Sequence, residues 1–385
     1  MKLNNIKVYL SAAAFALAVG TTSCVGDLDV DPINPQQTMT LDQDALLNKI
    51  YASFCLTGQT GPSGNGDVPG DEGQSEFYRM SWYMNEFTTD EAHWVWISDA
   101  GVPDLLHNNY GASNAFSSGL YYRLYFTITL CNFFLEQTTD DDPETAMQRA
   151  EVRYIRAYNY YYIMDLYGNA AFMTTVSSEL APRYERKQFF EFVESELLEI
   201  EPLLANPGQN TYGRADKAAA WMLLSRLYLN AEVYTGTAQW QNALTYAEKV
   251  INNGYYKLNT TGATNPSTGE KYSAYQMLFL ADNNETSAKY EAILPVLNDG
   301  VTTSSYGGMN FLILSTYAAT MDADIPSGTD CSWGKCTRVR GTLLDKFFSG
   351  DAPQTNSIAE MTAAAQDDRA LFYGAGYTHR ITDKT

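Results

Sequence analysis

Cysteine and histidine are scarce in this chain, and positive charge is outnumbered. The 385 residues include five cysteines and three histidines, which leaves few ligands for a metal centre built from several such side chains. Lys and Arg total 25 against 45 Asp and Glu, a net charge of −20 at pH 7. A field this acidic repels phosphate backbones, so we expect no binding to nucleic acid.

Long apolar runs are also missing. The apolar segment 8–19 follows two lysines and is too short to span a bilayer. A small-residue stretch, Thr21 to Ser23, comes directly before Cys24, so residues 1–23 are predicted to be a signal peptide. The end of this segment resembles a bacterial lipoprotein box, although Thr21 stands where an aliphatic residue is usual. We expect a mature chain that begins at a lipidated Cys24; an ordinary secretory peptide is the alternative.

An acidic, proline-containing segment comes next. Asp27, Asp29 and Asp31 suggest a calcium loop, but the glycine and distal glutamate of an EF-hand are absent. Residues 24–40 are therefore predicted to be a solvated tether, followed by one domain over 41–385. Export permits disulfides, and the sequence leaves open whether Cys331 and Cys336 pair.

Helical periodicity dominates the rest of the chain. The clearest helix starts with Asp142 and Pro143, carries apolar residues at steps of three and four, and ends at Gly168. Further helices are expected from about 43, over 186–205, after Asp216, over 240–253 and over 341–349. Their Ala, Leu and aromatic stripes are expected to be core. The pair on either side of Gly236 spans about one tetratricopeptide repeat, so we predict a mainly α, tetratricopeptide-like scaffold.

Two long stretches lack this periodicity. Residues 77–112 and 299–340 are expected to be irregular excursions rich in aromatic and polar side chains, and 58–73 is Gly- and Pro-rich. Residues 291–297 are expected to be a short extended segment. The excursions are the expected location of a ligand site.

Several longer motifs resemble the SusD/RagB family, and most of all its starch-binding member. The likeness covers essentially the whole mature chain and is carried by Asn85–Glu91, Arg149–Tyr158, Asp165–Gly168, Gly213–Ala220, Leu227–Ala231 and Asp367–Leu371. The resemblance implies a cell-surface, outer-membrane lipoprotein that binds α-glucan or starch oligosaccharides beside a SusC-like TonB-dependent transporter. Family members continue well beyond the last motif, so we expect this chain to lack the family's C-terminal part.

Glycan binding requires flat aromatic surfaces for the apolar face of a pyranose. The resemblance maps an aromatic arc to Trp96, Tyr306 and Trp333. Trp94 is expected to be core, with Trp96 on the other side of an alternating segment.

Sugar hydroxyls also require hydrogen-bonding partners. The resemblance maps these to Asp71, Arg79 and Asp99, where Asp99 replaces an amide of the starch-binding member with a group that only accepts. A surface salt bridge is the alternative for Arg79.

Enzymatic chemistry is not indicated. The acidic pair 90–91 points apart, the triplet 140–142 precedes a helix start, and no nucleophile elbow, P-loop or dinucleotide fingerprint appears. The alternatives left open are a binder of another glycan, a protein-docking scaffold and a glycoside hydrolase. No cofactor is required, although the resemblance allows a calcium ion with Asn284 as one ligand.

Overall fold

The computed structural model describes residues 41–58, 66–70, 75–299, 303, 308–316 and 336–374. The chain divides into two units, 1–42 and 43–385, and the helices and strands named here belong to the second. The predicted signal peptide, the tether and Cys24 lie outside the described residues. The domain boundaries therefore stay predictions.

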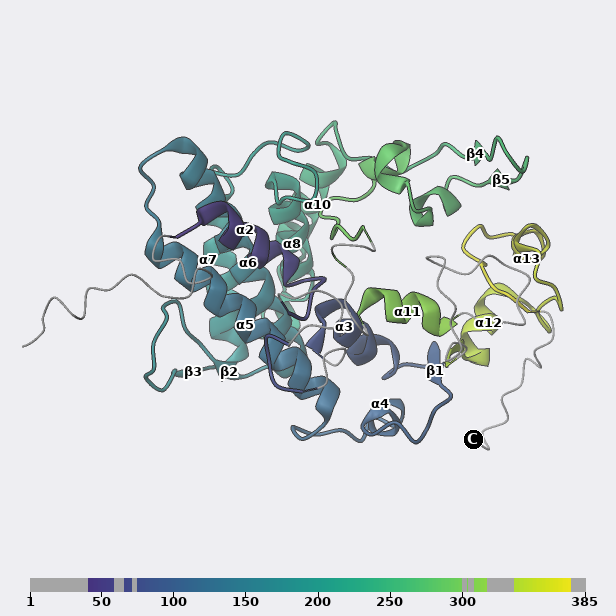
Figure 1. Cartoon of the computed structure of the whole chain (residues 1–385), viewed down its shortest axis with the longest axis horizontal. Coiled ribbons are helices and arrows are strands. Elements are labelled where there is room, and N and C mark those ends of the chain that lie inside the picture. The colour runs from purple at the N-terminus through teal and green to yellow at the C-terminus, as the bar shows by residue number, and fades with distance from the viewer. Residues whose placement is uncertain are drawn as a thin grey trace, which may run out of the picture. The chain divides into compact units, whose positions relative to one another are not determined.

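Long helices build the first half of the second unit (Figure 1). α6 (Pro143–Tyr167) packs on one side against α5 (Ala115–Gln137) and on the other against α7 (Arg186–Ile200). α8 (Lys217–Leu229) packs against α10 (Trp240–Ile251), and the short α9 (Ala231–Thr235) lies between them in sequence. The mainly α class is confirmed, whereas the tetratricopeptide pattern stays a prediction.

The ends of the predicted helices are fixed by local chemistry. The carboxylate of Asp142 accepts hydrogen bonds from two backbone amides of the first turn of α6, and Pro143 occupies the first helical position. Gly168 ends this helix at φ 76°, a conformation that a residue without Cβ adopts at little cost. Asp216 caps α8 in the same way as Asp142 caps α6. These predicted boundaries are confirmed.

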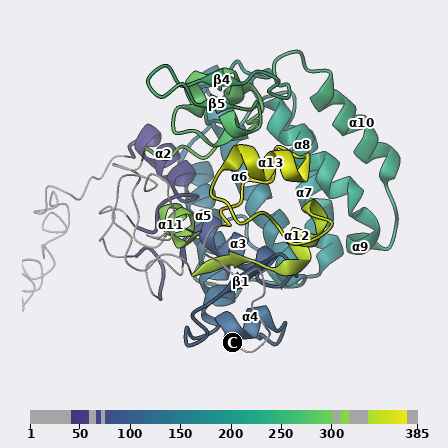
Figure 2. The same ribbon diagram turned by 90° about the vertical axis from the view of Figure 1, so that its right-hand side faces the viewer.

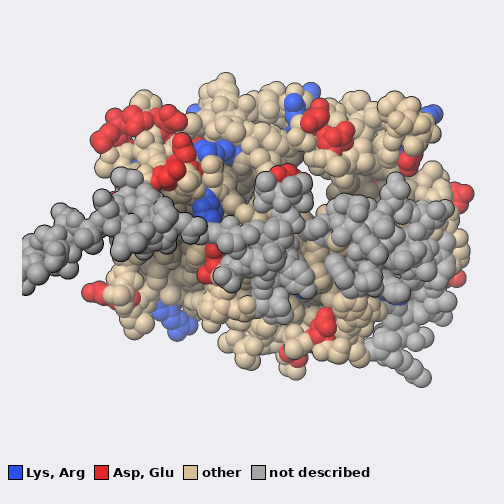
Figure 3. Space-filling view, viewed as in Figure 1, with Lys and Arg blue, Asp and Glu red and all other residues tan. Residues whose placement is uncertain are grey.

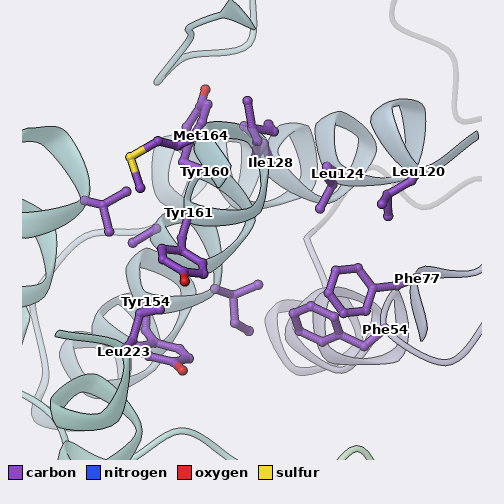
Figure 4. Close-up of a cluster of buried hydrophobic side chains, with 14 of the residues drawn as sticks. Phe54, Phe77, Leu120, Leu124, Ile128, Tyr154, Tyr160, Tyr161, Met164 and Leu223 are labelled. Atoms are coloured by element: carbon purple, nitrogen blue, oxygen red, sulfur yellow. The ribbon is translucent and has the colours of Figure 1, made fainter. Parts of the chain in front are cut away.

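Aromatic side chains from several elements fill the core (Figure 4). Phe54, which follows α2 (Gln43–Ala52), meets Phe77 edge to face, with ring centroids 5.0 Å apart. Tyr161 of α6 and Leu223 of α8 are likewise buried. Burying such side chains contributes roughly 1.5–3 kcal/mol each.

The segment 77–112 is not the irregular excursion that its sequence suggested. It contains α3 (Phe77–Glu86), β1 (Ala92–Trp94) and α4 (Val102–Leu106). The buried face of α3 includes the charged Arg79, which interrupts the apolar pattern from which a helix is recognised. α5, which follows this segment, was not predicted either, since its buried positions include Arg123 and Asn132.

The stretch 299–340 also contains regular structure. α11 (Met309–Thr316) and β6 (Thr337–Val339) lie within it. The predicted helix over 341–349 is α12 (Gly341–Phe347), and α13 (Ile358–Ala365) follows it. Residues 291–297 form no strand.

The apolar stripe predicted for α10 is only partly core. Ala243 and Val250 are buried, but Trp240 is 63% exposed and Leu244 is 50% exposed. α10 packs mainly against α8, so one helix face is covered and the adjoining apolar face is not. The prediction of a fully buried stripe is therefore wrong.

Three small antiparallel sheets complete the described elements. β1 pairs with β6, β2 (Ala170–Ala171) with β3 (Arg183–Tyr184), and β4 (Ala263–Thr264) with β5 (Lys271–Tyr272). The 3₁₀ helices η3 (Gln276–Phe279), η4 (Asn283–Glu285) and η5 (Ser287–Tyr290) follow β5. In the part of the chain that the structure describes, no helix combines the length and apolarity needed to cross a membrane.

Candidate functional site

The strand pair β1–β6 joins two segments that are far apart in the sequence. Ala92 pairs with Val339 and Trp94 with Thr337, and the amide of Val95 donates to the carbonyl of Cys336 at 2.8 Å. α11 contacts both α3 and β6 (Figure 2). These contacts gather parts of both predicted excursions around one side chain, Trp94.

Trp94 is the buried centre of this cluster, with 1% of its surface exposed. Its ring centroid lies 5.9 Å from each of three aromatic rings, those of Tyr83, Phe87 and Phe311. Its indole Nε1 donates a 2.8 Å hydrogen bond to Oδ2 of Asp99. The indole is thus held both by packing and by a polar contact, and the prediction that Trp94 is core is confirmed.

Trp96 projects from the end of this strand and is 36% exposed. Its ring stands edge-on to that of Trp94, with centroids 5.6 Å apart and planes at 79°. The difference in exposure does not come from strand alternation, because residues two apart share a face. It arises because β1 ends at Trp94, so the chain has left the strand at Trp96.

Asp99 closes the turn that follows Trp96. Its backbone amide donates to the carbonyl of Trp96 at 3.0 Å, while its side chain reaches back to Trp94. Oδ1 makes no hydrogen bond with any described residue, and the side chain is half-buried. Asp99 therefore orders the turn and keeps one acceptor oxygen available at its surface.

Arg79 lies beneath this surface and is 8% exposed. Its guanidinium lies over the ring of Phe311, 3.9 Å from the centroid, and Nε donates to the hydroxyl of Tyr83 at 3.2 Å. A cation over a desolvated aromatic face contributes about 2 kcal/mol. This placement favours support of the aromatic cluster over direct contact with a ligand.

Phe311 is the residue that the sequence analysis missed. It stacks on Trp94 with planes at 29° and covers the guanidinium of Arg79. Its helix, α11, is apolar over most of its length, so periodicity gives no signal there. Only the chain fold brings Phe311 to Trp94.

The loop before α3 is held by buried charges. Arg123 of α5 is fully buried, pairs with Asp67 at 3.0 Å and donates to the carbonyls of Thr57 and Ser75. Glu76 caps α3 by accepting from the amide of Arg79. Burial raises the pKa of Glu76 from 4.5 to about 7, although backbone hydrogen bonds oppose the shift.

The other predicted positions are less informative. Asp71, Tyr306, Trp333 and Cys331 lie outside the described residues. Asn284 is exposed in η4, and the described part of the chain holds no group of three metal-ligating side chains. Calcium binding stays a prediction.

Comparison with known proteins gives a consistent result. The family profile described as "Starch-binding associating with outer membrane", SusD-like, matches residues 28–229. The starch-binding protein SusD of Bacteroides thetaiotaomicron is 39% identical to this chain over 404 residues, which cover 97% of this chain and 70% of that protein.

Solved structures share the fold at low sequence identity. A SusD-like protein from Bacteroides fragilis NCTC 9343 superposes with a TM-score of 0.56 at 18% identity, covering 82% of this chain and 54% of that one. A structure solved with xylogluco-oligosaccharide gives a TM-score of 0.59 at 18% identity, covering 79% and 55%. This chain thus spans about half the length of these two relatives.

Proposed function

Because this chain belongs to the SusD-like family, we propose that it is a cell-surface lipoprotein that captures starch-like α-glucan for import by a SusC-like TonB-dependent transporter. The family is described by starch binding and association with the outer membrane. We assign this chain a binding role without catalysis. Acidic side chains are spread over the face drawn in Figure 3, and the net charge of the chain is −20. Because the proposed ligand is a neutral polymer, this charge does not oppose binding.

The observation that carries this proposal is the pairing of an exposed Trp96 with a buried Trp94. The exposed ring offers a flat apolar face, and its neighbour is fixed by aromatic packing and by Asp99. A platform that is ordered before binding loses little conformational entropy when a sugar stacks on it. By analogy with aromatic pairs, each stacked pyranose would contribute about 0.5–1.5 kcal/mol.

The remaining members of the proposed site adjoin this cluster along the chain. Tyr306 precedes the first residue of α11 by three positions, and Trp333 precedes Cys336 by three. Phe311 of α11 stacks on Trp94, and the carbonyl of Cys336 accepts a hydrogen bond from the amide of Val95. We therefore propose that Trp96, Tyr306 and Trp333 form one stacking arc.

Hydrogen bonds to sugar hydroxyls are assigned to two acids. Asp99 offers Oδ1, which no described residue uses, and Asp71 is assigned the same role. Arg79 is assigned to support the arc through Phe311, because little of its surface is exposed.

Affinity electrophoresis tests the substrate class. The full chain is run in native gels that contain amylopectin, pullulan, dextran, xyloglucan or a β-glucan. We expect retardation by amylopectin and pullulan. Retardation only by xyloglucan or the β-glucan would retain glycan binding but overturn the α-glucan assignment, and release of reducing ends would indicate a hydrolase.

Two further experiments test the proposed transporter partner and the proposed lipid anchor at Cys24. Co-purification of a TonB-dependent transporter without retardation by any glycan would favour a docking scaffold. Cys24→Ala is expected to release the protein from the membrane fraction in soluble form. Retention of the variant at the membrane, exposed as before, would contradict lipidation at Cys24.

A further inference from the structure

A partly open cavity of about 140 Å³ lies between α3, α6, α8 and the segment 293–296. Its walls are mostly apolar and include Phe54, Leu223 and Val296. Figure 4 shows that the lining residues Phe54, Tyr154 and Leu223 come from separate elements. A cavity of about 150 Å³ with such walls accommodates benzene, so this one suits a body of that size.

Two tyrosine hydroxyls at the cavity lack a protein partner. Tyr154 lines the cavity and is 3% exposed, and its hydroxyl makes no hydrogen bond with any described residue. Tyr78 on α3 also lines the cavity and is half-buried, and its hydroxyl likewise makes no hydrogen bond with any described residue. Neither oxygen is among the buried polar atoms that lack a partner, so both are accessible from the cavity. Each hydroxyl can therefore donate to a polar atom of a ligand.

One cation also borders the cavity. Arg226 is exposed at the mouth of the cavity, and its guanidinium lies over the ring of Tyr161, 5.4 Å from the centroid. It forms no ion pair within the part of the chain that the structure describes. The nearby carboxylate of Asp165 accepts a 2.7 Å hydrogen bond from Tyr234 instead. Arg226 is therefore available to a carboxylate, which its planar fork matches in geometry.

We propose that this cavity binds a small monocarboxylate whose apolar body is about the size of a benzene ring. The body occupies the apolar walls, the carboxylate pairs with Arg226, and the hydroxyls of Tyr154 and Tyr78 donate to the remaining lone pairs. This site is separate from the proposed glycan surface and does not depend on it.

The mostly apolar walls of the cavity favour a monocarboxylate over a phosphate or a sugar as the ligand. A phosphate dianion carries more charge and hydration into an apolar cavity, which costs several kcal/mol per ion without full pairing. A pyranose presents hydroxyls around its whole rim, whereas this cavity offers polar groups at a few positions only. A single carboxylate on an apolar ring satisfies both parts of the cavity.

Fluorine NMR with 4-fluorobenzoate tests the proposal on the full chain. The signal should shift or broaden saturably, and the melting temperature should rise with ligand concentration. The neutral analogue 4-fluorobenzamide has the same ring and should bind at least about tenfold more weakly. Equal binding of the two probes, or no binding of the benzoate at 10 mM, would overturn the proposal.

Variants locate the binding. Arg226→Gln should weaken 4-fluorobenzoate binding about tenfold or more and abolish the rise in melting temperature. Arg183→Gln, at an exposed position on β3, makes the same change of charge and should have no effect. Tyr154→Phe keeps the ring and should weaken binding severalfold.

The glycan site provides the independent control. Arg226→Gln should leave retardation by amylopectin unchanged, so failure of one proposal can be distinguished from failure of the other. If Arg226→Gln and Arg183→Gln bind 4-fluorobenzoate equally, the cavity is not the site.

Discussion

The indole Nε1 of Trp94 donates to Oδ2 of Asp99 across a five-residue turn, at 2.8 Å. The turn carries the exposed Trp96 between these two residues. The hydrogen bond between the buried Trp94 and the half-buried Asp99 therefore holds the ring of Trp96, the proposed sugar platform, in place. Such a contact links stability and binding at one position. Single substitutions in this turn separate the two effects.

Replacing either tryptophan should give opposite results. Trp96→Ala should abolish most retardation by α-glucan with little change in melting temperature, because 36% of the residue's surface is already exposed. Trp94→Ala removes a fully buried ring and should cost about 3–5 kcal/mol of unfolding free energy. Native gels and denaturant unfolding measure the two effects. A stable Trp96→Ala protein that binds normally would show that the site is elsewhere.

Removing the carboxylate of Asp99 should affect both properties. Asp99→Ala leaves the buried indole N–H without an acceptor, which costs about 1–3 kcal/mol, and it should also weaken glycan binding. Asp99→Asn keeps an acceptor oxygen and serves as the matched control, with a smaller loss of stability. If both variants melt like the wild type, the hydrogen bond does not stabilise the turn.

The ion pair that holds the loop before α3 should be strongly stabilising. Asp67→Asn leaves the guanidinium of Arg123 buried without its charged partner, because Arg123 is fully buried. We expect a loss of about 3–5 kcal/mol, measured by urea unfolding. Asp140→Asn breaks the exposed pair with Arg149 and should cost less than about 1 kcal/mol. Equal losses would contradict the importance of burial.

The raised pKa of Glu76 determines how the stability of the protein should change with pH. Burial raises the pKa of its carboxyl to about 7 in the folded state from 4.5, so the folded state binds more protons between these values. Stability should therefore fall as the pH rises from about 4.5 to about 7. Glu76→Gln keeps an acceptor for the cap of α3 and should flatten this dependence, as chemical unfolding at several pH values can measure. A profile with the same slope in both proteins would exclude Glu76 as its source.

The sequence was most informative where local chemistry determines structure. Asp142 and Asp216 open their helices because each side chain caps the amides directly after it. The burial of Trp94 and the exposure of Trp96 were also predicted, although from strand alternation, which is not their cause. Their exposure differs because the strand ends between them, and strand ends depend on the partner strand.

Long-range packing explains what the sequence did not reveal. Arg79 lies on the buried face of α3 because Phe311 covers it, and no local pattern indicates that α11 provides this cover. Trp240 was expected in the core, but a stripe of apolar residues does not show whether a partner exists to bury it. Both differences depend on contacts between segments that are distant in the sequence.

The pairing of β1 with β6 also has a consequence for the order of folding. Arg340 donates to the carbonyl of Ala92 across 248 residues, so β6, which completes the Trp94 cluster, emerges from the ribosome long after β1. At about 5–20 residues per second, it follows β1 by roughly 12–50 s. For most of this interval Trp94 lacks the ring of Phe311 and its partner strand, although Phe77 of α3 can already pack against Tyr162 of α6. Nascent chains that end before Cys336 should therefore fail to bind glycan, even when their helices have already formed.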